Sequence, residues 1–242
     1  MRRVLLLFAL LAPAWAQAAD MIRLVYQDQD PGAPPYVTRM LVTPQYLRID
    51  SGQGGGDFIL LDRTAHKIYS VSHATRQILL LAQSPVSAQA PKPWKVESRV
   101  TTMRPGTVRQ QILLNGKLCA TLVATAKLFP GAVAAQQEYM QVLAAAQWRT
   151  WQNTPAELRD PCDLALQVLD IPAQFSAGLL LEEHDADGRT RSIQEEGRVP
   201  LDAALFVLPK GYQTVELGRL LTGGGGHQGA LRRMRGASSP VS

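Results

Sequence analysis

The chain has 242 residues, of which 46% are hydrophobic and 19% charged, and its formal net charge is +5. This length suits one domain with a sizeable core. Six of the 25 Lys and Arg residues lie before residue 19 or after residue 218, where no acidic residue occurs, so the body carries 19 basic residues against all 20 acidic ones. A nearly neutral body argues against nucleic acid as a partner.

The first residues have the pattern of a secretory signal. A start with two arginines is followed by an apolar run from Val4 to Ala12 and by an A-Q-A sequence that ends at Ala18. This pattern predicts a signal peptide over residues 1–18, cleaved after Ala18, and therefore a periplasmic protein. The apolar run is too short to span a bilayer.

The rest of the chain divides into one domain and a tail. We expect a single β domain over residues 19–218, with a helical insert near residues 131–169. Residues 219–242 are Gly-rich and basic, a composition that predicts disorder. The arginines of this tail allow a weak contact with an anionic membrane surface.

Short apolar runs separated by turn-forming residues fill the first half of the domain. Asn115-Gly116 is a strong hairpin signal between two of these runs, and Pro85–Pro93 is a Pro-rich excursion that should lie on the surface. Strands are predicted over 21–27, 36–42, 45–50, 57–62, 66–71, 76–81, 94–102, 108–115 and 118–125.

The hydrophobic period changes to that of a helix after Pro130. Residues 131–151 place apolar side chains at three- and four-residue spacing, which predicts a long helix. A second helix should begin at Thr154–Glu157, restart at Pro161, run to Leu169 and end at Ile171-Pro172.

The last third returns to strands over 178–184 and 189–195, joined by Asp187-Gly188, and to apolar segments at 201–208 and 212–217. Strands, two helices and further strands predict a mainly β, α+β fold. We expect a large curved antiparallel sheet, or half-open barrel, covered by helices on one face.

Two stretches carry a resemblance to a known family. In FILLDRTAHKIYSVSHATRQILLL, a strand ending in Asp62 turns into Lys67-Ile68-Tyr69 and again into a third strand. In LDAALFVLPKGYQTVEL, an apolar strand with a Phe leads through Pro-x-Gly to a final strand. Both are similar to the periplasmic lipoprotein-carrier (LolA/LolB-like) superfamily. The resemblance implies a half-open β-barrel whose apolar concave face is closed by helices, in a family of carriers of acylated proteins and of regulators that sense them.

Cys119 and Cys162 are the only cysteines. Because an exported protein meets an oxidising compartment, we expect them to form a disulfide. The alternative is a reactive thiol at Cys162, which would lie in the first turn of a helix, where the dipole lowers a thiol pKa.

No motif predicts an enzyme. His66 and His73, with Asp57 and Asp62, are better interpreted as solvated turn residues than as metal ligands. The segment Glu183–Gly188 begins like a calcium loop but lacks the acidic residue at its twelfth position, which favours a plain hairpin. We expect no catalytic residue, no metal and no cofactor.

The favoured hypothesis is an apolar cavity between the sheet and the helix at 131–151, which binds an acyl chain, a lipid or an acylated protein. The alternative is a module that docks onto an envelope protein through its sheet face or the Pro85–Pro93 loop. The expected ligand-binding residues are Tyr139, Val142 and Leu143 of the helix, facing Leu60, Tyr69 and Leu79 of the sheet.

Overall fold

The computed structural model describes residues 19–217. The predicted signal peptide at 1–18 and the predicted tail at 219–242, with its membrane contact, lie outside the described residues. In the described part no helix is long and apolar enough to span a membrane.

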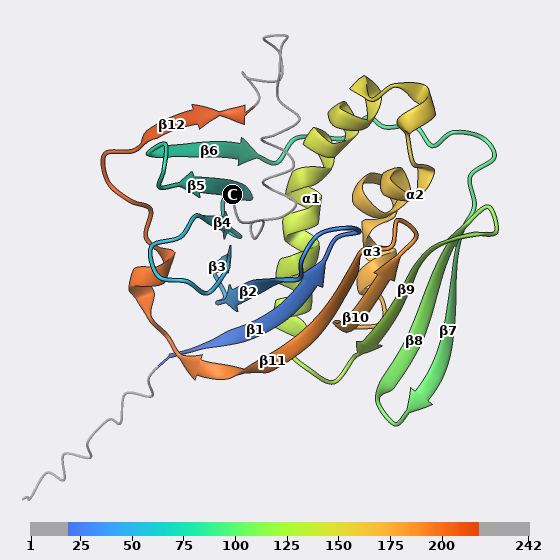
Figure 1. The fold of residues 1–242 in the computed structure, drawn as a ribbon, viewed down its shortest axis with the longest axis horizontal. Coiled ribbons are helices and arrows are strands. Elements are labelled where there is room, and N and C mark those ends of the chain that lie inside the picture. The colour runs from blue at the N-terminus through green and yellow to red at the C-terminus, as the bar shows by residue number, and fades with distance from the viewer. Residues whose placement is uncertain (1–18, 218–242) are drawn as a thin grey trace, which may run out of the picture.

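One curved sheet of twelve strands forms the body of the molecule (Figure 1). The spatial order of its strands is β12-β6-β5-β4-β3-β2-β1-β11-β10-β9-β8-β7. The first six are β1 (Asp20–Gln29), β2 (Tyr36–Val42), β3 (Tyr46–Asp50), β4 (Phe58–Asp62), β5 (Lys67–Ser72) and β6 (Gln77–Ala82). The last six are β7 (Val96–Arg104), β8 (Thr107–Leu114), β9 (Lys117–Thr125), β10 (Leu179–Asp185), β11 (Thr190–Pro200) and β12 (Gln213–Glu216).

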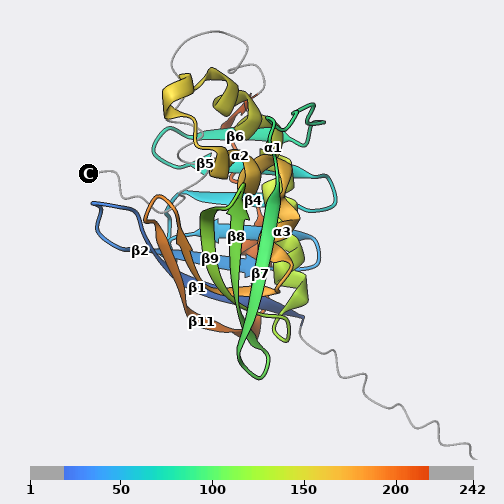
Figure 2. The same cartoon turned by 90° about the vertical axis from the view of Figure 1, so that its right-hand side faces the viewer.

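The pairing is antiparallel throughout, except that β12 runs parallel to β6. Asn115 and Gly116 both have positive φ, at 51° and 84°, which is the backbone of a two-residue hairpin turn between β8 and β9. The predicted mainly β, α+β fold is confirmed. Figure 2, turned by 90°, shows β7, β8 and β9 side by side at one end of the sheet.

The helices lie inside the curve of the sheet (Figure 1). The long helix α1 (Pro130–Asn153) begins with Pro at a position where no backbone N–H is needed. A 3₁₀ turn at Ala156–Leu158, α2 (Pro161–Leu164), a π-helical turn at Ala165–Leu169 and α3 (Ile171–Phe175) follow.

The expectation of two helices was wrong at Ile171-Pro172. This dipeptide does not end the helical segment but begins α3, because Pro172 lies in the first turn, where a missing N–H costs nothing. The structure therefore has three α-helices within residues 19–217.

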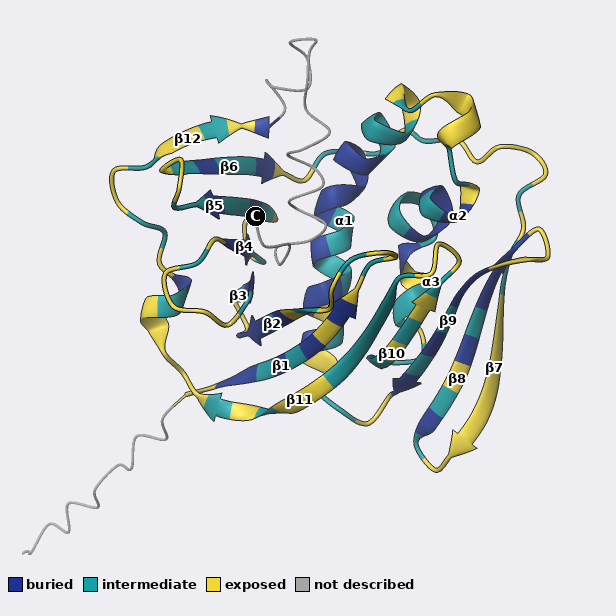
Figure 3. Cartoon of the chain, viewed as in Figure 1, coloured by how far each residue is buried: buried dark blue, intermediate teal, exposed yellow. Residues whose placement is uncertain are grey.

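Helix α1 packs onto the concave face of the sheet. Tyr139, Val142, Leu143 and Ala146 lie in one buried cluster with apolar residues of β1 to β6. The strands contribute Ile22, Leu24, Tyr26, Met40, Val42, Leu47, Ile49, Ile59, Leu61, Ile68 and Leu81. Figure 3 shows α1 mostly buried or half-buried and the edge strand β7 largely exposed.

A bidentate ion pair fixes α1 against the sheet. Arg63, just after β4, donates from Nε and Nη2 to the two carboxylate oxygens of Glu138, at 2.7 and 2.8 Å. Its Nη1 donates to the carbonyl of Thr43 at 2.9 Å. Such a forked, charge-assisted contact sets the rotation of the helix as well as its position.

A second cluster covers the convex face of β3 to β6. It contains Phe58, Leu60, Val71 and Ile78, closed over by Phe206. The segment 201–208, expected to be a strand, instead forms a 3₁₀ turn at Ala203–Phe206 that brings the Phe206 ring to 5.8 Å from the ring of Tyr46. Much of the apolar content of these strands is therefore buried away from α1.

Candidate functional site

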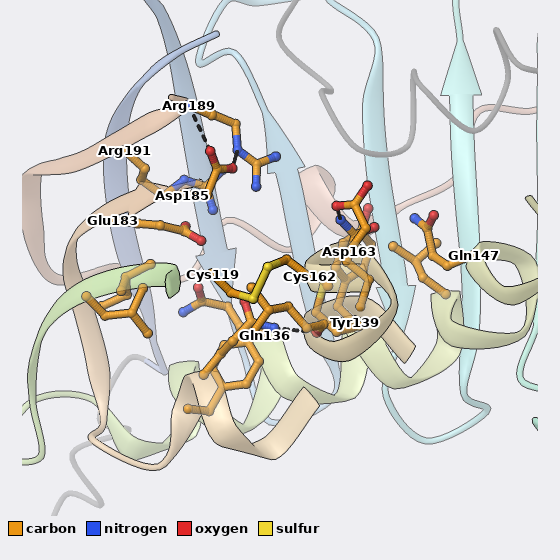
Figure 4. Close-up of a pocket in the computed structure, with 18 of the residues that line it drawn as sticks. Cys119, Gln136, Tyr139, Gln147, Cys162, Asp163, Glu183, Asp185, Arg189 and Arg191 are labelled. Carbon is orange, nitrogen blue, oxygen red and sulfur yellow. Dashed lines mark hydrogen bonds and ion pairs between the residues drawn. A yellow bond between two sulfur atoms is a disulfide. The ribbon is translucent and has the colours of Figure 1, made fainter. Parts of the chain in front are cut away.

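The concave side holds a cavity of about 150 Å³ between the sheet, α1 and the segment from α2 to α3 (Figure 4). Its apolar wall comes from elements that are far apart in the sequence. That wall consists of Met40, Ile49 and Ile59 of β2 to β4, Leu122 of β9, Leu180 of β10, Tyr139, Met140 and Leu143 of α1, and Leu166 and Phe175 of the insert.

Three buried polar side chains also line the cavity. Gln136 and Gln147 of α1 are 7% and 3% exposed, and Thr38 of β2 is 4% exposed. The wall is therefore mixed, whereas an apolar cavity was expected. An apolar wall with a few fixed polar groups is the usual composition of a small-molecule site.

Thr38 and Arg191 belong to a buried polar network at one end of the cavity. The carboxylate of Asp28, which is 2% exposed, accepts from Thr38 Oγ1 and Arg191 Nε, both at 2.5 Å, and from Arg191 Nη2 at 3.1 Å. Burial lowers the pKa of the Arg191 guanidinium, but the carboxylate of Asp28 outweighs this effect and holds that pKa above its ordinary value. A fixed charge therefore lies in the cavity wall.

The hairpin between β10 and β11 forms a solvent-exposed side of the cavity, called its mouth below, because Ala186 and Asp187 line the cavity and are exposed. Asp185 accepts from the Arg189 backbone N–H at 2.8 Å and pairs with Arg189 Nε at 3.0 Å. Gly188 has φ of 84°, which is typical of a hairpin turn. The segment Glu183–Gly188 is therefore part of a hairpin and not a calcium loop. Glu183 lies opposite Arg191 in the β10–β11 pairing, and Figure 4 shows these charged side chains grouped together.

A disulfide joins the sheet to the helical insert beside the cavity. Cys119 of β9 and Cys162 of α2 are bonded, as predicted, with a Cα–Cα distance of 5.3 Å. Both line the cavity and are 1% and 5% exposed. A disulfide is typical of a protein that folds outside the cytoplasm.

The six expected ligand-binding residues do not all lie around one site. Tyr139 and Leu143 line the cavity, whereas Val142 is buried next to them and Leu79 packs against the same concave cluster. Leu60 and Tyr69 belong to the convex cluster, so they do not face α1. This part of the predicted arrangement was wrong because β4 is apolar on both faces, and composition alone does not say which face the helix covers.

Sequence reasoning missed the charged mouth. A signal was present: Glu183 and Asp185 on one strand, and Arg189 and Arg191 on the next, alternate with other residues, so each pair shares one face of the hairpin. Charges at period two on both arms of a hairpin place four ionisable groups on a single surface.

The other histidine and carboxylate candidates lie elsewhere. His73 Nδ1 is 2.7 Å from the hydroxyl of Tyr212, and its backbone N–H donates to Asp57. His66 lies in the turn before β5, with φ of 51°. Among residues 19–217, no group of three or more His, Cys, Asp or Glu side chains is placed to hold a metal ion.

The fold and the cavity define the class of the protein: an α+β protein with one curved sheet and a helix-covered cavity on its concave side. No family model matches the chain, and no curated protein matches its sequence.

Solved structures give distant matches only. An uncharacterized conserved protein from Thermus thermophilus is 12% identical, with 82% of this chain and 91% of that chain covered and a TM-score of 0.38. PNGF-II is 12% identical, with 82% and 31% covered and a TM-score of 0.40. A LolA superfamily protein from Nitrosomonas europaea is 8% identical, with 80% and 92% covered and a TM-score of 0.29. Similarity at this level says nothing about function.

Proposed function

We propose that the protein is a non-enzymatic periplasmic binding protein that holds the apolar part of an amphiphile, such as an acyl chain, a lipid or an acylated protein, in the cavity beneath α1. The observation that carries the proposal is the cavity itself, with its apolar wall and charged mouth. One apolar end and one polar end match the two ends of an amphiphile.

The size of the cavity limits what it encloses. A cavity of about 150 Å³ holds a molecule of about the size of benzene, so a chain of about six carbons is the largest that the cavity would enclose without movement of the insert. A longer acyl chain would insert its end and leave the remainder at the mouth.

Native mass spectrometry of the protein purified from its own cell envelope tests the proposal. A lipid or acylated molecule that co-purifies and is lost on denaturation is the expected result. A protein that emerges at its bare mass, and that also fails to bind a neutral apolar probe such as 1-octanol, would contradict it.

A module that docks onto an envelope protein is the second candidate, because β7 is an exposed edge strand. Val100 and Met103 on this strand are 57% and 49% exposed, and among the described strands β7 pairs only with β8. A strand edge of this kind accepts an extended segment of a partner by strand addition. In the same mass spectra, a retained polypeptide would favour this candidate.

A further inference from the structure

The mouth of the cavity has an excess of negative charge. Within residues 19–217, five carboxylates but only two guanidinium groups line the cavity. The acidic residues are Asp160 and Asp163 of the insert and Glu183, Asp185 and Asp187 of the β10–β11 hairpin; the basic ones are Arg189 and Arg191. Figure 4 shows Asp163 across the cavity from Glu183 and Asp185.

Both arginines are already neutralised by carboxylates of the protein. Arg191 makes a two-pronged pair with Asp28, which lies behind the wall, and Arg189 pairs with Asp185. The charge of Asp160 is partly offset by Lys117, whose Nζ is 3.7 Å away. The other carboxylates of the mouth are Asp163, Glu183 and Asp187. The charge of Glu183 also acts on Arg189 and Arg191, and within residues 19–217 these three carboxylates together give the mouth its net negative charge.

The pKa of Asp187 is consistent with this excess. Partial burial raises the pKa of its carboxyl group, and the negative charges of Asp160 and Asp185 raise it further, which outweighs the lowering by Arg189 and Lys117. Since Asp160 belongs to the insert and Asp185 to the hairpin, carboxylates on both sides of the mouth act on one another.

An unpartnered acceptor in the cavity wall is an independent observation. The Nε2 amide group of Gln167 donates to Asp163 Oδ1 at 2.5 Å, which fixes the orientation of the side-chain amide. Its Oε1 atom is shielded from solvent and accepts no hydrogen bond in the described part of the protein. A buried acceptor without a donor is costly, and a ligand N–H group that reached Oε1 after a rotation of the Gln167 side chain would relieve that cost.

We propose that the ligand of this cavity carries a positively charged head group, a protonated amine, at the carboxylate-rich mouth, with its apolar chain beneath α1. This proposal rests on the proposed function. An ammonium group has three N–H donors, which suit carboxylate and amide acceptors spread around a mouth. A compact metal ion needs ligands gathered at one point, and residues 19–217 do not provide such a group.

Three octyl probes with the same chain test the head group: 1-octylamine, which is protonated at neutral pH, 1-octanol and octanoate. We expect octylamine to bind at least tenfold more tightly than octanoate in calorimetric titrations at low salt, with octanol between them. Raising the salt concentration should reduce the difference in affinity between octylamine and octanoate, because the mouth is partly open to solvent and salt screens exposed charges.

Single substitutions test which carboxylates cause the preference for octylamine. Glu183→Gln and Asp187→Asn should each reduce the preference for octylamine over octanol several-fold. Glu196→Gln, which removes the same charge from an exposed position of β11 outside the cavity, should leave it unchanged. Circular dichroism spectra check that each variant folds.

The outcomes separate the two proposals. If octanol binds but octylamine binds no more tightly than octanol, or if octanoate binds best, the cationic head group is wrong and the proposed function stands. If none of the three probes binds, both proposals fail.

Discussion

At the scale of single residues, the disulfide joins the sheet to the helical insert. Cys119 and Cys162 are separated by 43 positions, and closing a loop of this length stabilises the folded state by about 4 kcal/mol in the chain-entropy model. The Cys119→Ala, Cys162→Ala double variant should lose a similar free energy of unfolding, measured with denaturant. When the protein with its native sequence is unfolded in denaturant without reducing agent, alkylation should detect no free thiol. Labelling of either cysteine would contradict the presence of the disulfide.

Asp50 provides a prediction about pH. Burial would raise its pKa, but hydrogen bonds from Arg39, Arg48 and the backbone N–H of Gly52 hold the pKa of this 1% exposed carboxyl below its usual value. A lowered pKa in the folded state stabilises the protein above the unfolded pKa of about 4, and this stabilisation is lost as the pH falls through the folded value.

Asp50→Asn should therefore cost about 3 kcal/mol at pH 7, because it leaves the buried Arg48 and the partly exposed Arg39 without a counter-charge. The free energy of unfolding of the variant should also fall less than that of the native protein between pH 5 and pH 2. Glu196→Gln, at an exposed position, should keep the native pH profile. Identical profiles for the native protein and Asp50→Asn would show that Asp50 is not stabilised as a carboxylate.

At the scale of elements, α1 decides whether the cavity is open. Leu143 is 2% exposed and lines the cavity, so Leu143→Trp should fill it and abolish the binding of the neutral probe 1-octanol. The overpacking should cost about 1 to 3 kcal/mol.

Leu60→Trp is the matched control. Leu60 is also 2% exposed, but it lies on the convex face, so the same added volume should cost similar stability while leaving binding intact. Equal binding by Leu143→Trp and Leu60→Trp would place the ligand outside the cavity.

The elements themselves were largely predictable from the sequence. The first nine strands lie within about two residues of their predicted bounds because turn-formers separate short apolar runs, and α1 follows from its apolar spacing. The segment 201–208 was not predictable in the same way. Its apolar residues suit a strand, but Asp202 accepts a hydrogen bond from the Ala204 backbone N–H and starts a 3₁₀ turn.

At the scale of the whole molecule, contacts between distant segments determine what the sequence did not reveal. The pairing of β1 with β11 brings Asp28 to Arg191, two residues 163 positions apart. The cavity likewise needs β2 to β4, β9 to β11, α1 and the insert together. Apolar patterning predicted that α1 would cover the sheet, but it carried no information on where the charged hairpin would meet the helical insert.

The central claim is that the space beneath α1 accepts an apolar chain. Calorimetric titration of the native protein with straight-chain alcohols of four to eight carbons, neutral and so independent of the charged mouth, tests it most directly. Each CH₂ that enters the cavity should add about 0.8 kcal/mol, or roughly a fourfold gain in affinity. A negative heat-capacity change should accompany binding. The gain should continue up to about six carbons and then level off, as a cavity of about 150 Å³ requires. The absence of saturable binding, or an affinity that does not change with chain length, would contradict the account.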